Sequence, residues 1–145
     1  VWEMSNTTGP YSRFQLKQYI EQTQNDLFAD RQLRLMIENG NRQVVGIVDL
    51  CSFDPLHNRA EVGIMVDKSC RRQGIGRNAL ALLEEHCFRY LGIHQLFAYI
   101  AVENLPSRRL FAACGYKESA VLKEWAHTFG GGYTDVLVVQ KLNLS

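Results

Sequence analysis

Hydrophobic and polar residues alternate along this chain with two periods, one typical of strands and one typical of helices. A capping box at Ser12, followed by a roughly helical hydrophobic stripe, predicts a helix from about Ser12 to Gln24. Residues 32–38 alternate as a strand does, a turn follows at 39–41, and residues 44–50 return as the second arm of a hairpin. The chain therefore begins with a predicted helix and a predicted β-hairpin.

The rest of the chain continues to alternate between strands and helices. Residues 59–66 predict a third strand, which places Glu61, Gly63 and Met65 on one of its faces. Residues 75–90 carry the hydrophobic stripe of an amphipathic helix. The remaining predicted elements are a strand over 95–101, a helix over 106–114, and strands over 116–127 and 133–142, which a glycine turn at 129–132 joins. This order predicts a mixed α/β fold.

The composition is that of one globular domain. The 145 residues, 46% hydrophobic and 21% charged, fit a single domain with one core over residues 1–145. The formal net charge is +1, and the basic pair Arg71-Arg72 does not extend into a longer basic run. Nucleic acids and acidic membrane surfaces require a concentrated cationic face, so we expect neither as the main partner.

The cysteines and histidines are spaced too widely and irregularly for a metal site or a redox pair. We therefore expect reduced thiols and no metal. No hydrophobic stretch is long enough to span a bilayer, and no signal peptide is visible, so a cytoplasmic protein is the expectation. The residues concerned are Cys51, Cys70, Cys87, Cys114, His57, His86, His94 and His127.

The most informative segment joins the third strand to the long helix. Backbone N–H groups at a helix start have no partner within the helix and lie at the positive end of its dipole. The five amides from Gln73 to Arg77 are therefore predicted to surround a pyrophosphate, which Gly74 and Gly76 allow to approach closely. Arg71, Arg72 and Arg77 would add charged donors at the rim. The alternative interpretation is a glycine turn with exposed arginines.

Three blocks of sequence resemble the GNAT superfamily of N-acetyltransferases. Arg71-x-x-Gly74-x-Gly76 resembles the phosphate-binding motif of the family, in the expected setting between strand and helix. Asn104-x-x-Ser107-x-x-Leu110-Phe111-x-x-x-Gly115-Tyr116 resembles the later strand–helix signature. The ending from Trp125 to Asp135, together with Arg59-Ala60-Glu61-Val62, is similar to the branch of spermidine acetyltransferases and ribosomal-protein N-terminal acetyltransferases.

The resemblance implies a mixed, mostly antiparallel twisted sheet with flanking helices, and acetyl-CoA as co-substrate. It implies that acetyl-CoA lies between two splayed parallel strands, Glu61–Val66 and Gln95–Ala101. The backbone of Met65 and Val66 would pair with the pantetheine amides. The residues expected to contact acetyl-CoA are Met65, Val66, Arg71, Arg72, Gln73, Gly74, Ile75, Gly76, Arg77, Asn104, Ser107 and Phe111.

Acetyl transfer requires a neutral amine to attack the thioester. An alkyl amine with a pKa of ~10.4 is neutral in only about one molecule in a thousand near neutral pH, so a base must take its proton. Glu61 is the first candidate, because its strand should border the thioester. The alternative role for Glu61 is a strand-face carboxylate paired with an arginine. Asp49 is the second candidate, as the base or as an anchor for the amine.

Two features depart from the family pattern. Many relatives carry a tyrosine at the position of Phe111 that protonates the leaving thiolate, and phenylalanine has no proton to give. Water or another group, with Tyr99 and Tyr133 as candidates, would have to do so. The family also begins with a strand and a helix ahead of the one predicted at Ser12, whereas this sequence opens at Val1 without a methionine. We therefore expect those elements to be missing from a truncated sequence.

The resemblance leaves the acceptor and the assembly open. Polyamines would be attracted by Asp49, Asp54 and Glu61, whereas a peptide N-terminus, with a pKa of ~7.7–8.0, would need less help to deprotonate. We expect a small-molecule amine or a peptide N-terminus, and we keep a non-catalytic acetyl-CoA-binding regulatory module as the alternative. Because relatives often dimerise, a homodimer is among the expected assemblies.

Overall fold

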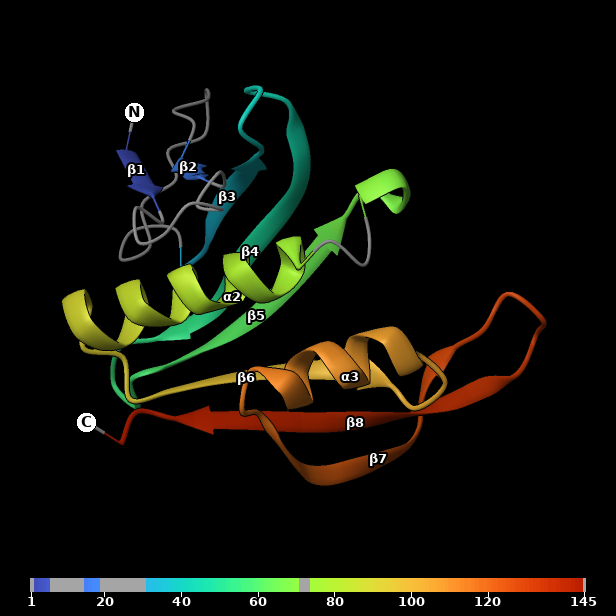
Figure 1. Ribbon diagram of the computed structural model, residues 1–145. Helices are drawn as coiled ribbons and strands as arrows, with labels where there is room; N and C mark the ends of the chain where they lie inside the picture. Colours follow the sequence, from blue (N-terminus) through green and yellow to red (C-terminus); the bar gives the residue numbers. More distant parts are fainter. Residues whose placement is uncertain (1, 6–14, 19–30, 71–73, 145) are drawn as a thin grey trace.

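The computed structural model describes residues 2–5, 15–18, 31–70 and 74–144 (Figure 1). The described strands form one eight-stranded sheet in the order β1-β2-β3-β4-β5-β6-β8-β7. The strands are β1 (Trp2–Ser5), β2 (Gln15–Gln18), β3 (Leu33–Glu38), β4 (Val44–Asp54), β5 (Arg59–Val66), β6 (Gln95–Ala101), β7 (Lys117–His127) and β8 (Tyr133–Leu142). The helices are the 3-10 turn Lys68–Cys70, α2 (Ile75–Glu85) with its π-helical continuation His86–Tyr90, and α3 (Leu105–Ala113). The predicted mixed, mostly antiparallel sheet is confirmed.

The sequence pattern was wrong at the start of the chain. Gln15–Gln18, which it assigned to a helix from Ser12 to Gln24, form strand β2 and pair with β3, while residues 12–14 and 19–24 lie outside the described residues. β1 in turn pairs with β2. The expectation that the first strand is missing therefore needs correction, because β1 and β2 both precede the hairpin of β3 and β4.

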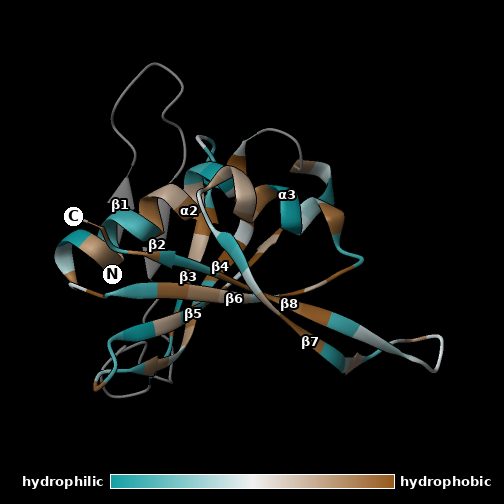
Figure 2. Ribbon diagram, turned by 90° about the horizontal axis from the view of Figure 1, so that it is seen from below, coloured by the Kyte–Doolittle hydropathy of each residue, from teal (hydrophilic) through white to brown (hydrophobic). Residues whose placement is uncertain are grey.

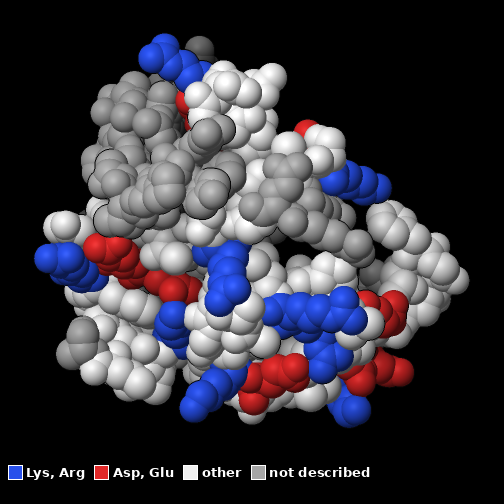
Figure 3. Space-filling view, viewed as in Figure 1, with Lys and Arg blue, Asp and Glu red and all other residues white. Residues whose placement is uncertain are grey.

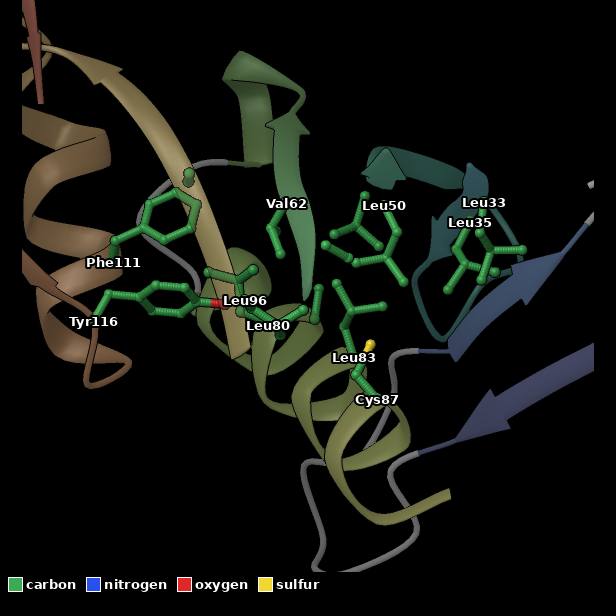
Figure 4. Packing of buried hydrophobic residues seen from close by; sticks show 14 of the residues in the cluster. Leu33, Leu35, Leu50, Val62, Leu80, Leu83, Cys87, Leu96, Phe111 and Tyr116 are labelled. Carbon is green, nitrogen blue, oxygen red and sulfur yellow. The ribbon is translucent and has the colours of Figure 1, made fainter. Parts of the chain in front are cut away.

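The hydrophobic core lies between the sheet and the two helices. Figure 2 shows α2 and α3 on the same side of β6 and β8, with hydrophilic and hydrophobic segments alternating along the helices. Leu80 and Leu83 of α2 are fully buried against strand residues such as Leu96, and each such side chain contributes about 1.5–3 kcal/mol. Figure 4 shows these residues converging with Phe111 and Tyr116 from the α3 side.

One ion pair lies on the side of the sheet that the helices cover. Glu84 of α2 is 7% exposed, and its Oε2 accepts from the Lys141 ammonium of β8 at 2.6 Å. Lys141 also donates to the Cys114 carbonyl at 2.6 Å, so one ammonium group connects α2, the end of α3 and β8. Burial raises the pKa of Glu84, and Lys141 lowers it again in part.

The surface carries both signs of charge in close mixture. In Figure 3, lysine and arginine side chains alternate with aspartate and glutamate over the face that is viewed, as a net charge of +1 suggests. No helix within the described ranges is both long and apolar enough to cross a bilayer. Among the same residues, no group of three or more histidine, cysteine and carboxylate side chains is arranged to hold a metal ion.

Candidate active site

The centre of the sheet opens where its two parallel strands separate. β5 and β6 pair only through Arg59–Glu61 and Gln95–Phe97, although both strands continue beyond that point. Figure 1 shows the two strands diverging toward their carboxyl ends. The backbone ladder is therefore interrupted between Val62–Val66 on one strand and Ala98–Ala101 on the other, and we call this unpaired region the gap.

The ladder of β4 and β5 determines which backbone groups are turned toward this gap. The Asp67 N–H donates to the Val45 carbonyl at 2.8 Å, so the odd-numbered residues of β5 direct their N–H and C=O groups toward β4. Ile64 directs its backbone groups the other way and lies beyond the last pair with β6. The backbone groups of Met65 are therefore turned toward β4 and those of Ile64 toward the gap, while the predicted contact of Met65 with acetyl-CoA stays a prediction.

The same argument applies to the opposite wall. The Val102 N–H donates to the Asp135 carbonyl at 3.0 Å, so the even-numbered residues of β6 direct their backbone groups toward β8. Tyr99 directs its backbone toward the gap. An extended ligand between the strands would thus meet main-chain donors and acceptors on both sides, as an inserted strand does.

The predicted phosphate site lies at the start of α2. Gly74 is the N-cap residue with φ of 76°, a left-handed conformation that favours glycine, and the helix start has no side-chain cap. The amides of Ile75, Gly76 and Arg77 follow it in the first turn, where they have no intrahelical acceptor. Arg71, Arg72 and Gln73 lie outside the described residues, so their predicted contribution stays a prediction.

Gly76 has a second role that the motif did not indicate. A Cβ atom built there would lie 3.2 Å from Leu110 Cδ2 and 3.7 Å from Ile64 Cδ1. Gly76 therefore faces α3 and β5, and its missing side chain lets α2 approach α3. Glycine at position 76 is therefore explained by helix packing as well as by the predicted close approach of a phosphate group.

Asn104 and Ser107 lie at the start of α3. Asn104 is the N-cap, and its Oδ1 accepts from the Ser107 N–H at 3.3 Å, with Pro106 in the first turn. α3 starts shortly after the carboxyl end of β6, on the opposite wall of the gap from α2. The fold therefore brings the two predicted motif blocks to the same end of the gap, one on each wall.

Glu61 lies where the gap begins. It is in register with Cys51 on β4 and Phe97 on β6, at the last pair before the strands separate. Its side chain is on the face opposite to the helices. No described arginine forms an ion pair with Glu61, so the alternative role predicted for it has no support among these residues.

A β-bulge in β4 lies beside Glu61. Between the pairs Cys51–Glu61 and Asp54–Arg59, two residues of β4 face one residue of β5, and Ser52 has φ of 51°. The bulge brings Ser52 Oγ to 3.5 Å from Glu61 Oε1. Burial, and then the charge of Glu61, raise the pKa of the Cys51 thiol.

Asp49, the second predicted catalytic residue, is engaged elsewhere. Its two carboxylate oxygens accept from Arg34 Nε at 2.8 Å and from Arg34 Nη2 at 3.1 Å. This bidentate pair compensates the charge of Asp49, so Glu61 is the stronger candidate for a base. The sequence analysis did not identify Arg34, because the ladder of this hairpin shifts between Ile37 and Glu38, and an uninterrupted ladder from the Glu38–Val44 pair would place Arg34 opposite Val48 instead of Asp49.

Phe111 packs inside the core. Its side chain is 3% exposed and meets Tyr116 edge to face, with ring centroids 4.9 Å apart. Its burial gives Phe111 a packing role, while its predicted contact with acetyl-CoA stays a prediction. Val66 and Met65, at the end of β5, are half-buried and 70% exposed, respectively.

Comparisons with known proteins agree with this arrangement. The chain is 27% identical over 128 residues to the spermidine N(1)-acetyltransferase of Vibrio cholerae serotype O1, covering 88% of this chain and 72% of the relative. It is 35% identical over 96 residues to an N-acetyltransferase 9-like protein of Nematostella vectensis, covering 60% of this chain and 48% of that protein.

Solved structures give the same result. A dodecameric spermidine N-acetyltransferase from Vibrio cholerae superposes with a TM-score of 0.75 at 25% identity, covering 81% of this chain and 68% of that one. Residues 1–117 match the model of the acetyltransferase (GNAT) domain. The two motif blocks, the divergent parallel strands and these matches agree, and the chain belongs to the GNAT acetyltransferase family.

Proposed function

We propose that this chain transfers an acetyl group from acetyl-CoA to a primary amine by direct attack on the thioester. The observation that carries the proposal is the gap between β5 and β6, with main-chain groups of Ile64 and Tyr99 turned into it and Glu61 at its narrow end. A thioester held in this gap would be reached by the acceptor from the face on which Glu61 lies.

Acetyl-CoA would be held along its length by main-chain groups. The first amides of α2, from Gly74 to Arg77, would bind the pyrophosphate. The backbone of Ile64 and of Val66 would meet the pantetheine from the β5 side, and Asn104 and Ser107 would contact it from α3. By the resemblance to the family motif, Arg71, Arg72 and Gln73 would add further donors to this pyrophosphate site, which we call the cradle.

Proton transfer falls to Glu61 in this proposal. The ammonium of the acceptor loses a proton to the Glu61 carboxylate, directly or through one water molecule, and the neutral nitrogen attacks the carbonyl carbon. A C–N bond forms, the C–S bond breaks, the nitrogen releases its second proton to water, and the thiolate of CoA leaves. The charge of Asp49 is compensated by Arg34. The Asp49–Arg34 ion pair would therefore lie beside the acceptor as a dipole, and Asp49 would not be the base.

A non-catalytic acetyl-CoA-binding module is the second candidate, and Phe111 favours it. The buried phenylalanine has no proton for the leaving thiolate, so water, Tyr99 or Tyr133 would have to supply one. Thiols are much more acidic than alcohols, with a pKa of about 8.5 for free cysteine, so a thiolate can leave without being protonated first. This chemistry favours the enzyme over the module.

The acceptor class is a small-molecule amine, such as a polyamine, or a peptide N-terminus. The relatives named above as spermidine acetyltransferases support a polyamine, and the uncompensated carboxylate of Glu61 would attract a cation. A homodimer and a cytoplasmic location remain predictions.

Two measurements on the same preparation test the proposal. Calorimetry with acetyl-CoA should give saturable binding, and mass spectrometry of a mixed pool of polyamines and short peptides should give products heavier by one acetyl group. Binding without any acetylated product or release of CoA thiol would favour the module. An absence of binding would contradict both candidates.

The Gly74→Val variant tests the cradle separately. Valine at φ of 76° is strained and brings a branched side chain to the first amides of α2, so affinity for acetyl-CoA should fall by about tenfold or more. Gly92→Val is the matched control, because Gly92 also has a positive φ of 66° but lies at the far end of the long helix. Equal affinity in the two variants would count against the cradle.

A further inference from the structure

Gly63 occupies a position in β5 for which the fold does not require glycine. Among the residues that the structure describes, a Cβ atom built there meets a single atom within 4 Å, Asp49 Cβ at 4.0 Å, and Gly63 has no positive φ. At Gly46, by contrast, an added Cβ would lie 2.5 Å from the Met65 carbonyl oxygen. Glycine inside a strand costs about 0.5–1 kcal/mol relative to alanine, so Gly63 weakens β5 without a structural return.

The missing side chain leaves a notch on the face that carries Glu61. Glu61 and Met65 flank Gly63 on the same face of β5, each about 7 Å away along the strand, because successive residues rise about 3.4 Å. Asp49 bounds the notch from β4, in register with Gly63. The fourth side opens onto the gap between β5 and β6, since Gly63 lies beyond the last parallel pair.

The walls of this notch suit a cation on an apolar stem. The carboxylate of Asp49 is paired with Arg34, whereas no lysine or arginine within the described ranges forms an ion pair with Glu61, so the attraction for a cation comes from Glu61. Met65, 70% exposed, supplies an apolar wall opposite Glu61. A group in the notch would thus have a carboxylate at one end and a thioether side chain at the other.

We propose that Gly63 is a specificity-determining residue that admits an unbranched primary ammonium to the thioester. This inference rests on the proposed function. The notch is one side chain wide and is bounded by Asp49 and Met65, so it favours a –CH2–NH3+ group over a carbon that carries a second substituent next to the nitrogen. The acceptor class is therefore a linear alkylamine or polyamine rather than an α-branched amine such as a peptide N-terminus.

Filling the notch tests this inference. Gly63→Ala is compatible with the fold, since its Cβ makes only an ordinary contact, and it should raise the KM for linear amines and lower kcat/KM by about tenfold or more. Affinity for acetyl-CoA, measured by calorimetry, should not change. Gly130→Ala is the matched control, because a Cβ there also meets one side-chain atom at 4.0 Å, Thr128 Oγ1, far from the gap.

The substrate pair is a linear primary amine and its isomer with a methyl group on the carbon next to nitrogen. The unmodified protein should prefer the linear amine by about tenfold or more, and Gly63→Ala should lower activity on both. If Gly63→Ala and Gly130→Ala have the same KM and the same preference, the inference is wrong and the acetyltransferase proposal stands. If no amine yields product with the unmodified protein or the control, both fail.

Discussion

The two faces of the sheet differ although they are built from the same strands. On β6, Leu96, Ala98 and Ile100 are at most 4% exposed and pack under the helices, while Tyr99 between them is 46% exposed. On β5, Ala60 and Val62 are buried and alternate with Glu61 and Gly63. Residues that hold the fold and residues that form the candidate site therefore alternate one by one, so a one-residue shift of register would exchange them.

The largest expected effect is the loss of stability when a side chain on the helix-covered face is truncated. We compare it with a truncation on the other face. Leu96→Ala removes a fully buried side chain and should lower the free energy of unfolding by about 3–4 kcal/mol. Met65→Ala, on the other face, should change it by less than about 0.5 kcal/mol. Urea denaturation followed by circular dichroism measures both, and equal losses would contradict the division between the faces.

Removing the Lys141 ammonium from the buried ion pair should lower the free energy of unfolding slightly less than Leu96→Ala does. Lys141→Met leaves the Glu84 carboxylate buried without its partner, which should lower the free energy of unfolding by about 3 kcal/mol at pH 7. Burial holds the folded-state pKa of Glu84 above its unfolded value, so protonated Glu84 favours folding at low pH and this advantage is lost as pH rises through the folded pKa. The loss in Lys141→Met should therefore shrink toward pH 4.

Denaturation of Lys141→Met at several pH values checks this prediction. The double variant Lys141→Met/Glu84→Gln is the control, because it replaces the carboxylate by a neutral group and should recover part of the loss at pH 7 while weakening the pH dependence. A loss that is independent of pH would indicate packing rather than charge as its cause.

Much of the fold could be predicted because its strands are locally distinct. Residues 59–66 and 95–101 are short, mostly hydrophobic segments, and they became β5 and β6 with the predicted bounds. The segment Gln15–Gln18 was mispredicted because a short hydrophobic stripe fits either period, and pairing with β3 decides in favour of a strand. Local periodicity carries no information about which edge is available for pairing.

Residues of the candidate site that belong to a local sequence motif could be predicted. Contacts between segments that are distant in the sequence could not. Glu61 and Gly74 follow from the strand and the glycine pattern. The bidentate pair of Arg34 with Asp49 depends on the register of a hairpin whose ladder shifts between Ile37 and Glu38. The Lys141–Glu84 pair joins residues 57 positions apart and has no local signal.

Neutralising the carboxylate of Glu61, on the sheet face opposite to the helices, should affect catalysis rather than stability. Glu61→Gln should lower kcat/KM for an alkylamine by about 100-fold near pH 7.5, equivalent to about 2.7 kcal/mol, because few acceptor molecules are then neutral. The deficit should narrow as pH rises and the amine loses its proton unaided. Acetyl-CoA affinity should stay the same.

Rate profiles against pH for Glu61→Gln and for Glu85→Gln measure this effect. Glu85 is the control because it is an exposed glutamate on α2, paired only with Arg89 among the contacts that the structure describes for it. A Glu61→Gln profile that coincides with that of the unmodified protein would remove Glu61 from the mechanism. A peptide N-terminus as acceptor should show a smaller deficit, since its pKa of ~7.7–8.0 leaves more of it neutral.

The smallest expected effect is on the reactivity of a thiol next to Glu61. Burial and then the negative charge of Glu61 raise the pKa of Cys51, so Glu61→Gln should increase its thiolate fraction and speed alkylation by iodoacetamide a few-fold near pH 8. Peptide mass spectrometry follows each cysteine in one sample. Cys114 is an internal reference, since its raised pKa comes from burial and Glu84, and Cys87, fully buried with a pKa of about 12, should stay unmodified. An unchanged rate at Cys51 would mean that the Glu61 carboxylate does not act on the thiol across the β4–β5 pair.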